Sequence, residues 1–518
     1  MIILRKVKKM EEKVTAKLCG ITKSFGSVKA NDGVDLTIRN GEIHAILGEN
    51  GSGKSTLMNI LSGLYAPDGG EIYLDGKATR IRSPREALQL GIGMIHQHFK
   101  LVDVFSAWEN IAGGTGRGPS LPAKQIQKNL KELCSRYHLE LDPSKKIYQM
   151  AVGEKQTVEI VKALYRGATI LILDEPTAVL TPQETRVLFS ILRSMRDEGC
   201  AVLLITHKLQ EVMDVSDRVT VFRKGKSVAS MITSECTAER LAELMVGRSM
   251  DLNIRRAQIP GGVQTPVVTI RDLTVFGPGR QKKLNGISLD IRSHEILGIA
   301  GISGSGQKEL CEAITGMQPA KGSILLNGRE LTGQNPRTIL NSGIHIGFIP
   351  EDRLGMGLVG GMDLTDNVAL RSYKRRKGPF LDLKGSRQAA EDLICRYQVS
   401  TPGPDQIIKR LSGGNIQKVL LGREIDLNPE LLIAAYPVRG LDIGASHFIY
   451  DQLNEQKKKG VAILLIGEDL DVLLGLCDRI AVLHAGELMG IVDAITAAKE
   501  QLGLMMMGRK EEPVPCSE

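Results

Sequence analysis

Several features that mark other protein classes are scarce or missing in this sequence. Only 4% of the 518 residues are aromatic, with a single tryptophan. No apolar run approaches the roughly 18 residues that suggest a transmembrane helix. The first residues, MIILRKVKKMEEK, are basic but have neither a long apolar segment nor a small-residue cleavage site, so we expect no secretory signal. An integral membrane protein and an exported protein are both disfavoured.

The cysteines and the charges argue against further classes. The eight cysteines are scattered without a C-x-x-C pair or a metal-like spacing, which is typical of reduced thiols and not of a disulfide framework or a zinc site. The net charge of +8 comes without a long run of Lys or Arg. We therefore interpret it as a solvated basic surface and expect no nucleic-acid binding. At 518 residues the chain exceeds what one core supports, so two or more domains are expected.

The sequence contains one long internal repeat. GEIHAILGENGSGKSTL (41–57) recurs 253 residues later as HEILGIAGISGSGQKEL (294–310). DVSDRVTVFRKGK (214–226) recurs 261 residues later as GLCDRIAVLHAGE (475–487). The repeat period is a whole domain, which indicates a tandem duplication and not a solenoid. The growing offset places about eight extra residues in the middle of the second copy, where we expect a loop.

The repeat and the composition between its copies predict the domain boundaries. The segment SMDLNIRRAQIPGGVQTP (249–266) is polar and contains Pro and Gly, as linkers do. In each half, short apolar strands such as TILILD and LLIAA alternate with helical stretches, which favours an α/β domain with a mostly parallel sheet and a helical insertion. The predicted layout is a first domain at 14–248, a linker at 249–266, a second domain at 267–509 and a tail at 510–518.

A glycine-rich loop in the first half carries the strongest chemical signal. GENGSGKST matches G-x-x-x-x-G-K-[ST] between a predicted strand and a predicted helix, which indicates a nucleotide-binding P-loop. Backbone amides of such a loop surround phosphate oxygens, the lysine approaches the outer phosphates and the serine hydroxyl ligates Mg²⁺. The predicted ATP-binding residues here are Gly48, Glu49, Asn50, Gly51, Ser52, Gly53, Lys54, Ser55 and Thr56.

Two acids complete this predicted site. The apolar strand in ILILDEP ends at Asp174, which is suited to orient Mg²⁺, and Glu175 follows, which is suited to polarise the attacking water. Alone, such a pair after a strand is usually a helix-capping turn. Because the P-loop lies upstream, the catalytic interpretation is favoured.

With these motifs, nearly the whole chain resembles the ATP-binding subunits of ABC transporters. The resemblance implies two tandem P-loop NTPase domains of the ABC type, each with an antiparallel β portion beside the parallel core. It implies that Phe25 stacks on adenine, although packing within its strand is the alternative. It implies that Gln97 senses Mg²⁺ and the γ-phosphate, and that His207 contacts the γ-phosphate.

The signature motif of that family is divided unequally between the halves. The second half has it as LSGGN, with Ser412, Gly413, Gly414 and Asn415. The first half has MAVGE (150–154), in which alanine replaces the serine and valine the first glycine.

The second half instead has lost the catalytic motifs. Its P-loop has Gln307 where Lys54 is expected, its two acids have become Ala435 and Tyr436, and the positions of Gln97 and His207 hold Glu351 and Glu468. In the family the halves pair head-to-tail, and each site combines one half's P-loop with the other half's signature. All losses then fall in one composite site, so we expect one hydrolytic and one degenerate site.

The resemblance also implies a task. Together with AVGEKQ, FIPEDR and RGLDIGA, the tandem architecture resembles importer ATPases for nucleosides and monosaccharides, and LLIAAYPVRGLDIGA favours the nucleoside branch. Such a subunit works with two membrane permeases and an extracytoplasmic binding protein, at the cytoplasmic face of the membrane. We expect the permeases to dock around 99–111, where Phe105 and Trp108 either face the partner or pack inward. A less favoured alternative is a soluble tandem protein acting on ribosomes or nucleic acid.

Overall fold

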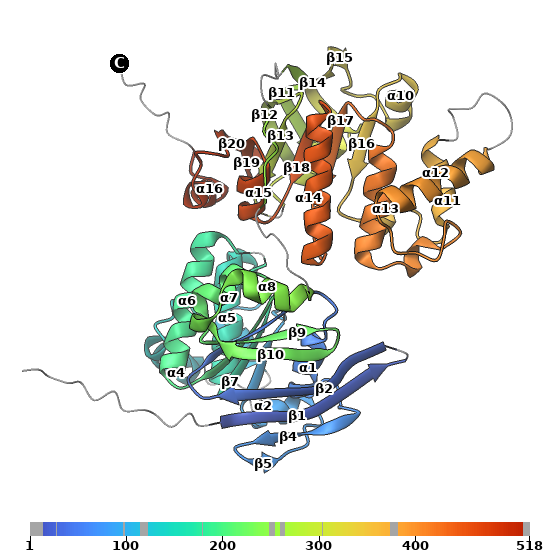
Figure 1. Ribbon diagram of the computed structural model, residues 1–518. Coiled ribbons are helices and arrows are strands. Elements are labelled where there is room, and N and C mark those ends of the chain that lie inside the picture. The colour runs from blue at the N-terminus through green and yellow to red at the C-terminus, as the bar shows by residue number, and fades with distance from the viewer. Residues whose placement is uncertain are drawn as a thin grey trace, which may run out of the picture. The chain divides into compact units, whose positions relative to one another are not determined.

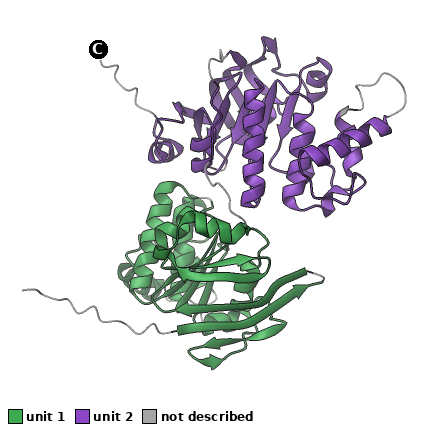
Figure 2. Ribbon diagram, in the orientation of Figure 1, with its two compact units in different colours: residues 1–252 green, residues 253–518 purple. Residues whose placement is uncertain are grey.

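A computed structural model describes nine stretches of the chain: 14–26, 28–96, 99–113, 123–178, 180–247, 254–259, 265–302, 304–372 and 382–510. The chain separates into two compact units, residues 1–252 and 253–518 (Figure 2). The unit boundary falls inside the predicted linker. Part of that linker packs on the second unit: the backbone amide of Ala257 donates to Asn454 Oδ1 at 2.9 Å, and the Arg256 guanidinium donates to the Leu474 carbonyl at 2.6 Å.

Each unit has a four-stranded antiparallel sheet in the same strand order, as the family resemblance implies (Figure 1). In the first unit the order is β2-β1-β4-β5, with β1 (Val14–Phe25), β2 (Val28–Arg39), β4 (Gly69–Leu74) and β5 (Lys77–Ala78). In the second it is β12-β11-β14-β15, with β11 (Pro266–Phe276), β12 (Lys282–Arg292), β14 (Ala320–Leu326) and β15 (Arg329–Glu330).

Each unit also has a six-stranded sheet that is parallel except for one edge strand, as predicted. The first sheet has the order β10-β9-β3-β8-β7-β6, with β3 (Ile43–Gly48), β6 (Ile92–Ile95), β7 (Ile170–Asp174), β8 (Ala201–Thr206), β9 (Arg218–Arg223) and β10 (Lys226–Ile232). The second has the matching order β20-β19-β13-β18-β17-β16, with β13 (Ile296–Ala300), β16 (Ile346–Ile349), β17 (Leu431–Ala435), β18 (Ala462–Ile466), β19 (Arg479–His484) and β20 (Glu487–Asp493).

The helices repeat in the same order. The first unit has α1 (Lys54–Leu61), α2 (Pro84–Gln89), α3 (Ala107–Ala112), α4 (Ala123–Arg136), α5 (Val152–Tyr165), α6 (Pro182–Asp197), α7 (Leu209–Val215) and α8 (Ala238–Val246). The second has α9 (Gln307–Ile314), α10 (Pro336–Asn341), α11 (Leu364–Ser372), α12 (Leu383–Arg396), α13 (Gly413–Ile425), α14 (Ile443–Lys458), α15 (Leu470–Leu476) and α16 (Lys499–Met506). The predicted helical insertion corresponds to α3–α5 and α11–α13. Figure 1 shows α11 and α12 beyond the β16 edge of the second parallel sheet.

The buried strands explain why the parallel sheets form. Every residue of β3, β8, β13, β17 and β18 is buried, so these strands read as unbroken apolar runs and not as alternating ones. In each unit helices cover one face of this sheet, and the antiparallel sheet covers the other face together with α1 or α9. Within each sheet the parallel strands all end on the same side. Among the described residues, no helix is both long and apolar enough to cross a membrane.

The extra residues of the second half are not confined to one loop. The amides of Val102 and Val359 are equivalent, because each donates to an asparagine side chain at the start of the insertion: Val102 to Asn110 Oδ1 of α3 and Val359 to Asn367 Oδ1 of α11, both at 2.8 Å. This pair is 257 residues apart, whereas the end of β6 and the end of β16 are 254 apart. Three additional residues therefore precede α11, where the chain forms the short π-helical turn η4 (Arg353–Gly357).

Candidate functional site

The predicted P-loop of the first half joins β3 to α1 at the carboxyl edge of the parallel sheet. Gly53, the N-cap of α1, has φ 100°, and a Cβ there would collide with the carbonyl of Ala30. A Cβ on Gly48 would clash with the carbonyl of Phe222 and the Ser52 hydroxyl. These positions require glycine, and the loop can therefore curl tightly enough to direct its amides at a phosphate.

Lys54 lies folded against this loop. Its Nζ donates to the carbonyl of Gly48 at 2.6 Å and to that of Glu49 at 2.8 Å, and the residue is 5% exposed. Burial lowers the pKa of the Lys54 ammonium to about 8, against the opposing pull of Glu175, Asp174 and Glu49. An incoming phosphate would stabilise the charged form, so the site is prepared for an anion.

The two acids follow β7 at the same edge of the sheet. Glu175 takes the left-handed region, φ 46°, and its amide donates to the carbonyl of Ile205 at the end of β8 at 3.0 Å. Its Oε1 lies 2.8 Å from Nδ1 of His207, and this hydrogen bond keeps the pKa of the Glu175 carboxyl below its ordinary value. Burial, followed by the charge of Glu175, raises the pKa of Asp174. The structure therefore brings Lys54, Asp174, Glu175 and His207 into one cluster of charges.

The residues at this site suit a magnesium ion held together with phosphate. Ser55 lies exposed in the first turn of α1, which follows β3, and Asp174 ends β7, which is separated from β3 by β8. Hydroxyl and carboxylate oxygens are the ligands that Mg²⁺ prefers, usually one or two from protein, with phosphate and water completing the shell. No cluster of three or more His, Cys, Asp or Glu able to hold a metal alone occurs in the described residues. The third predicted ligand, Gln97, lies outside the described residues.

Phe25 ends β1 on the surface. Its ring is 46% exposed and meets Tyr65 edge-on, with 5.4 Å between the centroids, while Lys23 Nζ lies 5.7 Å from the ring. Inward packing within the strand, the alternative to adenine stacking, does not describe this exposed position. An aromatic ring that is exposed in this way can stack on a planar base.

The second half keeps the shape of the P-loop without its charge. Gly304 and Gly306 have φ 89° and 105°, close to the 77° and 100° of Gly51 and Gly53. Gln307 is 3% exposed, and its amide donates to the carbonyl of Ile302 at 3.1 Å, the contact that Lys54 makes with Glu49. A neutral donor thus takes the lysine's structural place.

Lys308 does not supply the missing charge to the second loop. Its side chain is 74% exposed, and its Nζ lies 3.7 Å from Glu312, one turn further along α9. Neighbouring helix residues differ in direction by roughly 100°, so Lys308 points away from the loop to which Gln307 is turned.

The acid positions of the second half hold a different group of charges. Tyr436 repeats the backbone of Glu175, with φ 49° and an amide that donates to Ile466 at 2.9 Å. The Arg439 guanidinium forms ion pairs with Glu351 and with Glu468, the second at 3.4 Å. Arg439 was not among the site residues predicted from the sequence. Its alignment with Ala178 of the first half was the available signal, since a cation had appeared where the first half has none.

The intact signature begins α13. Ser412 is the N-cap, and its hydroxyl accepts from the backbone amide of Asn415 at 3.5 Å and from the Asn415 side-chain amide at 2.9 Å. Gly413 and Gly414 form the first turn. Because glycine has no side chain, the backbone at this helix end allows close approach of an anion.

Acidic side chains occupy the matching place in the first half. The Glu154 carboxylate accepts from the N-cap amide of α5 at 2.8 Å, and Glu184 accepts from the amide of Gly153 at 3.2 Å. The corresponding residues of the second half are the neutral Asn415 and Ala445. Two carboxylates therefore occupy the helix end that would have to face a phosphate. Lys145 pairs with Glu154 at 2.7 Å, so the repulsion of an anion rests on Glu184. Glu184 lies 30 residues from the motif in sequence and was missed for that reason.

The second half also keeps an exposed aromatic residue at the position of Phe25. Phe276 ends β11, is 37% exposed, and has Lys321 Nζ 5.5 Å from its ring. Phe276 was not among the residues predicted from the sequence, although the internal repeat aligns SFG with VFG.

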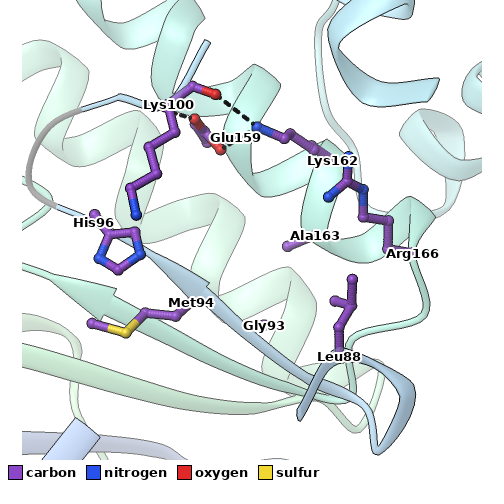
Figure 3. Close-up of a pocket in the computed structure, with 9 residues that line it drawn as sticks. All are labelled: Leu88, Gly93, Met94, His96, Lys100, Glu159, Lys162, Ala163 and Arg166. Atoms are coloured by element: carbon purple, nitrogen blue, oxygen red, sulfur yellow. Dashed lines mark hydrogen bonds and ion pairs between the residues drawn. The ribbon is translucent and has the colours of Figure 1, made fainter. Parts of the chain in front are cut away.

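A cavity of about 180 Å³ lies between β6 and α5 in the first half, beside His96 and Lys100 (Figure 3). It is lined by Leu88, Gly93, Met94, His96, Lys100, Glu159, Lys162, Ala163 and Arg166. Glu159 accepts from the amide of Lys100 at 2.8 Å and lies 3.3 Å from Lys162 Nζ, so α5 is hydrogen-bonded to the backbone at Lys100. Of the two residues expected at a dock nearby, Phe105 is 46% exposed, whereas Trp108 packs against the hydrophobic core.

Comparison with known proteins adds the family. The family model described as ABC transporter matches residues 31–178 and 284–438, once in each half. The chain is 46% identical over 506 residues to the nucleoside import ATP-binding protein NupA of Lactococcus lactis, covering 96% of this chain and 99% of that protein. It is 43% identical over 504 residues to the guanosine import ATP-binding protein NupO of Bacillus subtilis (96% and 98% covered) and 40% identical over 498 residues to the ribose import ATP-binding protein RbsA 1 of Rubrobacter xylanophilus (94% and 97% covered).

Proposed function

Because this chain belongs to the ABC transporter family and is an ATPase of that family, we propose that it energises the import of nucleosides through separate permease subunits. In this proposal it has one hydrolytic and one degenerate composite ATP site. The observation that carries the proposal is the cluster of Lys54, Asp174, Glu175 and His207 at one sheet edge, together with the replacement of every one of them in the second half.

Hydrolysis at the first site follows from the roles of its side chains. The P-loop amides and Lys54 hold the β- and γ-phosphates, and Phe25 stacks on the adenine. Glu175 accepts a proton from a water molecule as that water attacks the γ-phosphorus, and the bond to the bridging oxygen of ADP breaks. His207 holds the Glu175 carboxylate in place and keeps it ionised.

Magnesium has a defined place in this proposal. Ser55 and Asp174 would hold it, with Gln97 as the proposed third ligand, and when bound the ion neutralises charge on the phosphates. Asp174 has a raised pKa because of burial and Glu175, and a nearby cation would restore its ionised form.

Head-to-tail pairing completes the hydrolytic site with Ser412, Gly413, Gly414 and Asn415 of the second half. The other composite site would combine the neutral loop around Gln307 with the helix end that Glu154 and Glu184 already occupy. The proposed pairing thus places a cationic loop with a neutral signature and a neutral loop with an acidic one. Only the first combination favours a γ-phosphate, and the ATP-driven closure that moves the permeases would depend on it.

Two surfaces support docking of two permease subunits at the cytoplasmic face of a membrane. In the first half three apolar side chains that follow Lys100 of the cavity lining in sequence are exposed, namely Val102, Val104 and Phe105. In the equivalent segment of the second half four apolar side chains are 38–46% exposed: Leu354, Met356, Val359 and Met362. Apolar groups gathered at one place on each half are typical of a partner surface. An extracytoplasmic binding protein would deliver the substrate.

The substrate class rests on sequence likeness. Identity is 46% and 43% to proteins named for nucleoside and guanosine import and 40% to one named for ribose import. The pair Ala435 and Tyr436, which replaces the acids of the second half, is the feature that favours nucleosides. The alternative is a monosaccharide importer of the ribose or galactose type, which the ribose relative supports.

Uptake of labelled nucleosides and ribose tests both parts of the proposal. Cells lacking the protein are supplied again with wild type, with Glu175→Gln, or with the exposed-charge control Lys308→Gln. We expect wild type and the control to restore nucleoside uptake and Glu175→Gln to restore none. Restoration of ribose uptake instead would assign the sugar branch, and uptake that Glu175→Gln sustains would contradict the single hydrolytic site.

A further inference from the structure

Three chain segments of the second half meet at one guanidinium. Glu351 follows β16, Glu468 follows β18, and Arg439 lies in the turn after β17. Arg439 pairs with both carboxylates, the one of Glu468 at 3.4 Å. We name Glu351, Arg439 and Glu468 the Arg439 cluster.

The Arg439 cluster occupies the positions that would surround the γ-phosphate in the first half. Its members align with Gln97, Ala178 and His207. Under the proposed function, the first half gathers these segments around Mg·ATP, and its fixed cation is Lys54 of the P-loop. In the second half the P-loop is neutral. The cation there is Arg439, in the turn after β17, and it forms ion pairs with the chain's own carboxylates. Arg439 therefore joins three segments of the second half, whereas in the described residues of the first half the Glu175–His207 hydrogen bond joins the segments after β7 and β8.

The aromatic residue at the catalytic position supports this guanidinium. The centre of the Arg439 guanidinium lies 5.9 Å from the centroid of the Tyr436 ring. Burial, followed by Glu468 and Glu351, raises the pKa of the Tyr436 hydroxyl, so it stays neutral beside the two acids. A planar guanidinium that stacks on a ring and contacts two carboxylates has few orientations left.

Stability is not the main consequence of these contacts. The side chains of Glu351, Arg439 and Glu468 are 40–50% exposed, and ion pairs at such exposure contribute little to folding stability. What a bridge between three segments supplies is a fixed geometry of those segments.

A second arginine connects this geometry to the signature. Arg353, in the η4 turn that contains extra residues of the second half, donates from Nη2 to the carbonyl of Arg439. A methyl group placed on Gly413 would lie 3.5 Å from Nη1 of Arg353. Burial lowers the pKa of Arg353, as expected of a guanidinium enclosed between two segments. The turn after β17 is thus held by Arg353 from one side and by the two carboxylates from the other.

The same turn leads into α14, whose start lies against the signature. Asp442 caps α14 by accepting from the amide of Ala445 at 2.7 Å. A methyl group on Gly414 would lie 3.4 Å from the Ala445 side chain and 3.8 Å from the Asp442 carboxylate. The signature glycines therefore lie next to two groups that the turn after β17 connects, namely Arg353 and the N-terminus of α14, with room for little more than a methyl group between them.

We propose that Arg439 and Arg353 are positioning residues for ATP hydrolysis, because together they hold the signature Ser412–Asn415 in its working orientation without nucleotide on the second P-loop. This inference rests on the proposed function, in which that signature completes the hydrolytic site of the first half. Neither arginine touches the reacting phosphate. One bound ATP then suffices to assemble a productive site, since the second half is already organised.

The test is a double-mutant cycle in the full-length chain with Arg439→Gln, Arg353→Gln and the double variant. Each single variant is expected to lower kcat about tenfold, and the double variant no more than about twofold further, because both residues act on one turn. Arg387→Gln, which removes an exposed pair with Asp405 elsewhere in the second half, is the matched control and should leave kcat within twofold. Arg439→Lys keeps a cation without the planar fork and should fall between wild type and Arg439→Gln.

Binding and melting separate positioning from a merely structural role. ATP affinity measured without Mg²⁺ depends on the first P-loop, so we expect it within twofold of wild type in every variant, with thermal midpoints within about 2 °C. Unchanged kcat in both single variants, additive losses in the double variant, or a parallel loss of ATP affinity would each overturn the inference. If wild type itself does not hydrolyse ATP, or Glu175→Gln still does, the proposed function fails instead.

Discussion

The two halves share a backbone and differ in where they place a cation. In the first half the charge is Lys54, buried under the P-loop and facing two acids. In the second half the P-loop position holds Gln307, and the positive charge is that of Arg439 in the turn after β17, which pairs with Glu351 and Glu468. Lys54 can therefore take a phosphate as its partner, whereas the partners of Arg439 are carboxylates of the chain itself. Comparing the halves thus shows which features of a nucleotide site belong to the backbone conformation and which depend on the side chains.

The shared backbone shows which features belong to the fold. Glu175 and Tyr436 both lie in the left-handed region, at φ 46° and 49°, and both amides donate to the end of the next strand. A non-glycine residue there costs of order 1 kcal/mol, which is often taken as a sign of function. Here the same conformation persists where the carboxylate is gone. The turn from strand to helix therefore imposes it, and the side chain alone decides the chemistry.

The largest expected difference between the halves lies at these two residues. Glu175→Gln removes the proton acceptor and should lower steady-state ATP hydrolysis by at least about a hundredfold. Tyr436→Phe, at the mirror position, removes only a hydroxyl from a place without a carboxylate and should stay within twofold. Phosphate release by the full-length chain measures both. Equal losses in the two variants would contradict the division into a hydrolytic and a degenerate site.

The P-loop cation offers the next test. Lys54→Gln gives the first loop the residue of the second, keeps the hydrogen bond to a loop carbonyl, and should reduce kcat/KM for ATP by about 10²- to 10³-fold because the fixed charge is lost. The reverse change, Gln307→Lys, should not create a second hydrolytic site, since no carboxylate follows β17. Counting the phosphate released per protein chain in a single turnover at saturating ATP checks this. A doubled yield in Gln307→Lys would show that the loop charge alone was missing.

The two signatures should respond unequally. Ser412→Ala removes the N-cap hydroxyl that the proposed function aims at the γ-phosphate, and a hydrogen bond to a charged group accounts for a loss of roughly ten- to a hundredfold in kcat. Ala151→Ser restores a hydroxyl to the first signature and should change kcat less than twofold, because Glu154 and Glu184 still face that helix end. A gain in activity from Ala151→Ser would mean that both composite sites turn over.

The smallest expected effect is a pH dependence of ATP affinity. The pKa of Lys54 is lowered to about 8 by burial, and bound phosphate should raise it. Below pH 8 the lysine is already charged, whereas above it binding must take up a proton, so affinity should fall by up to about tenfold per pH unit. Calorimetry at pH 8.5 in buffers of different ionisation enthalpy measures the uptake. Lys308→Gln, at an exposed lysine, should leave it unchanged.

The sequence predicted the fold and the family from local patterns. Unbroken apolar strands predicted the parallel sheets, and the repeat predicted two copies of one domain; both are confirmed, as is membership of the ABC transporter family. These predictions succeed because a strand buried on both faces and a P-loop are defined by a few adjacent residues. The assignment of the individual site residues stays a prediction, and so does the preference for nucleosides over sugars.

What the sequence did not provide depended on contacts between distant segments. Glu184 accepts a hydrogen bond from Gly153, 31 residues away in sequence, and Arg353 donates to the carbonyl of Arg439, 86 residues away. No sequence motif predicts either contact. The eight extra residues were expected as one loop, yet three of them precede α11 and contribute to the turn that carries Arg353.

The sequence by itself determined which catalytic groups each half possesses, because residue identity and spacing suffice for a P-loop, an acid pair and a signature. The tertiary structure decided what replaces them where they are missing. Only the fold brings Glu351, Arg439 and Glu468 to one place, because the three parallel strands that precede them end on the same side of the sheet although their ends are 86 and 31 residues apart in sequence.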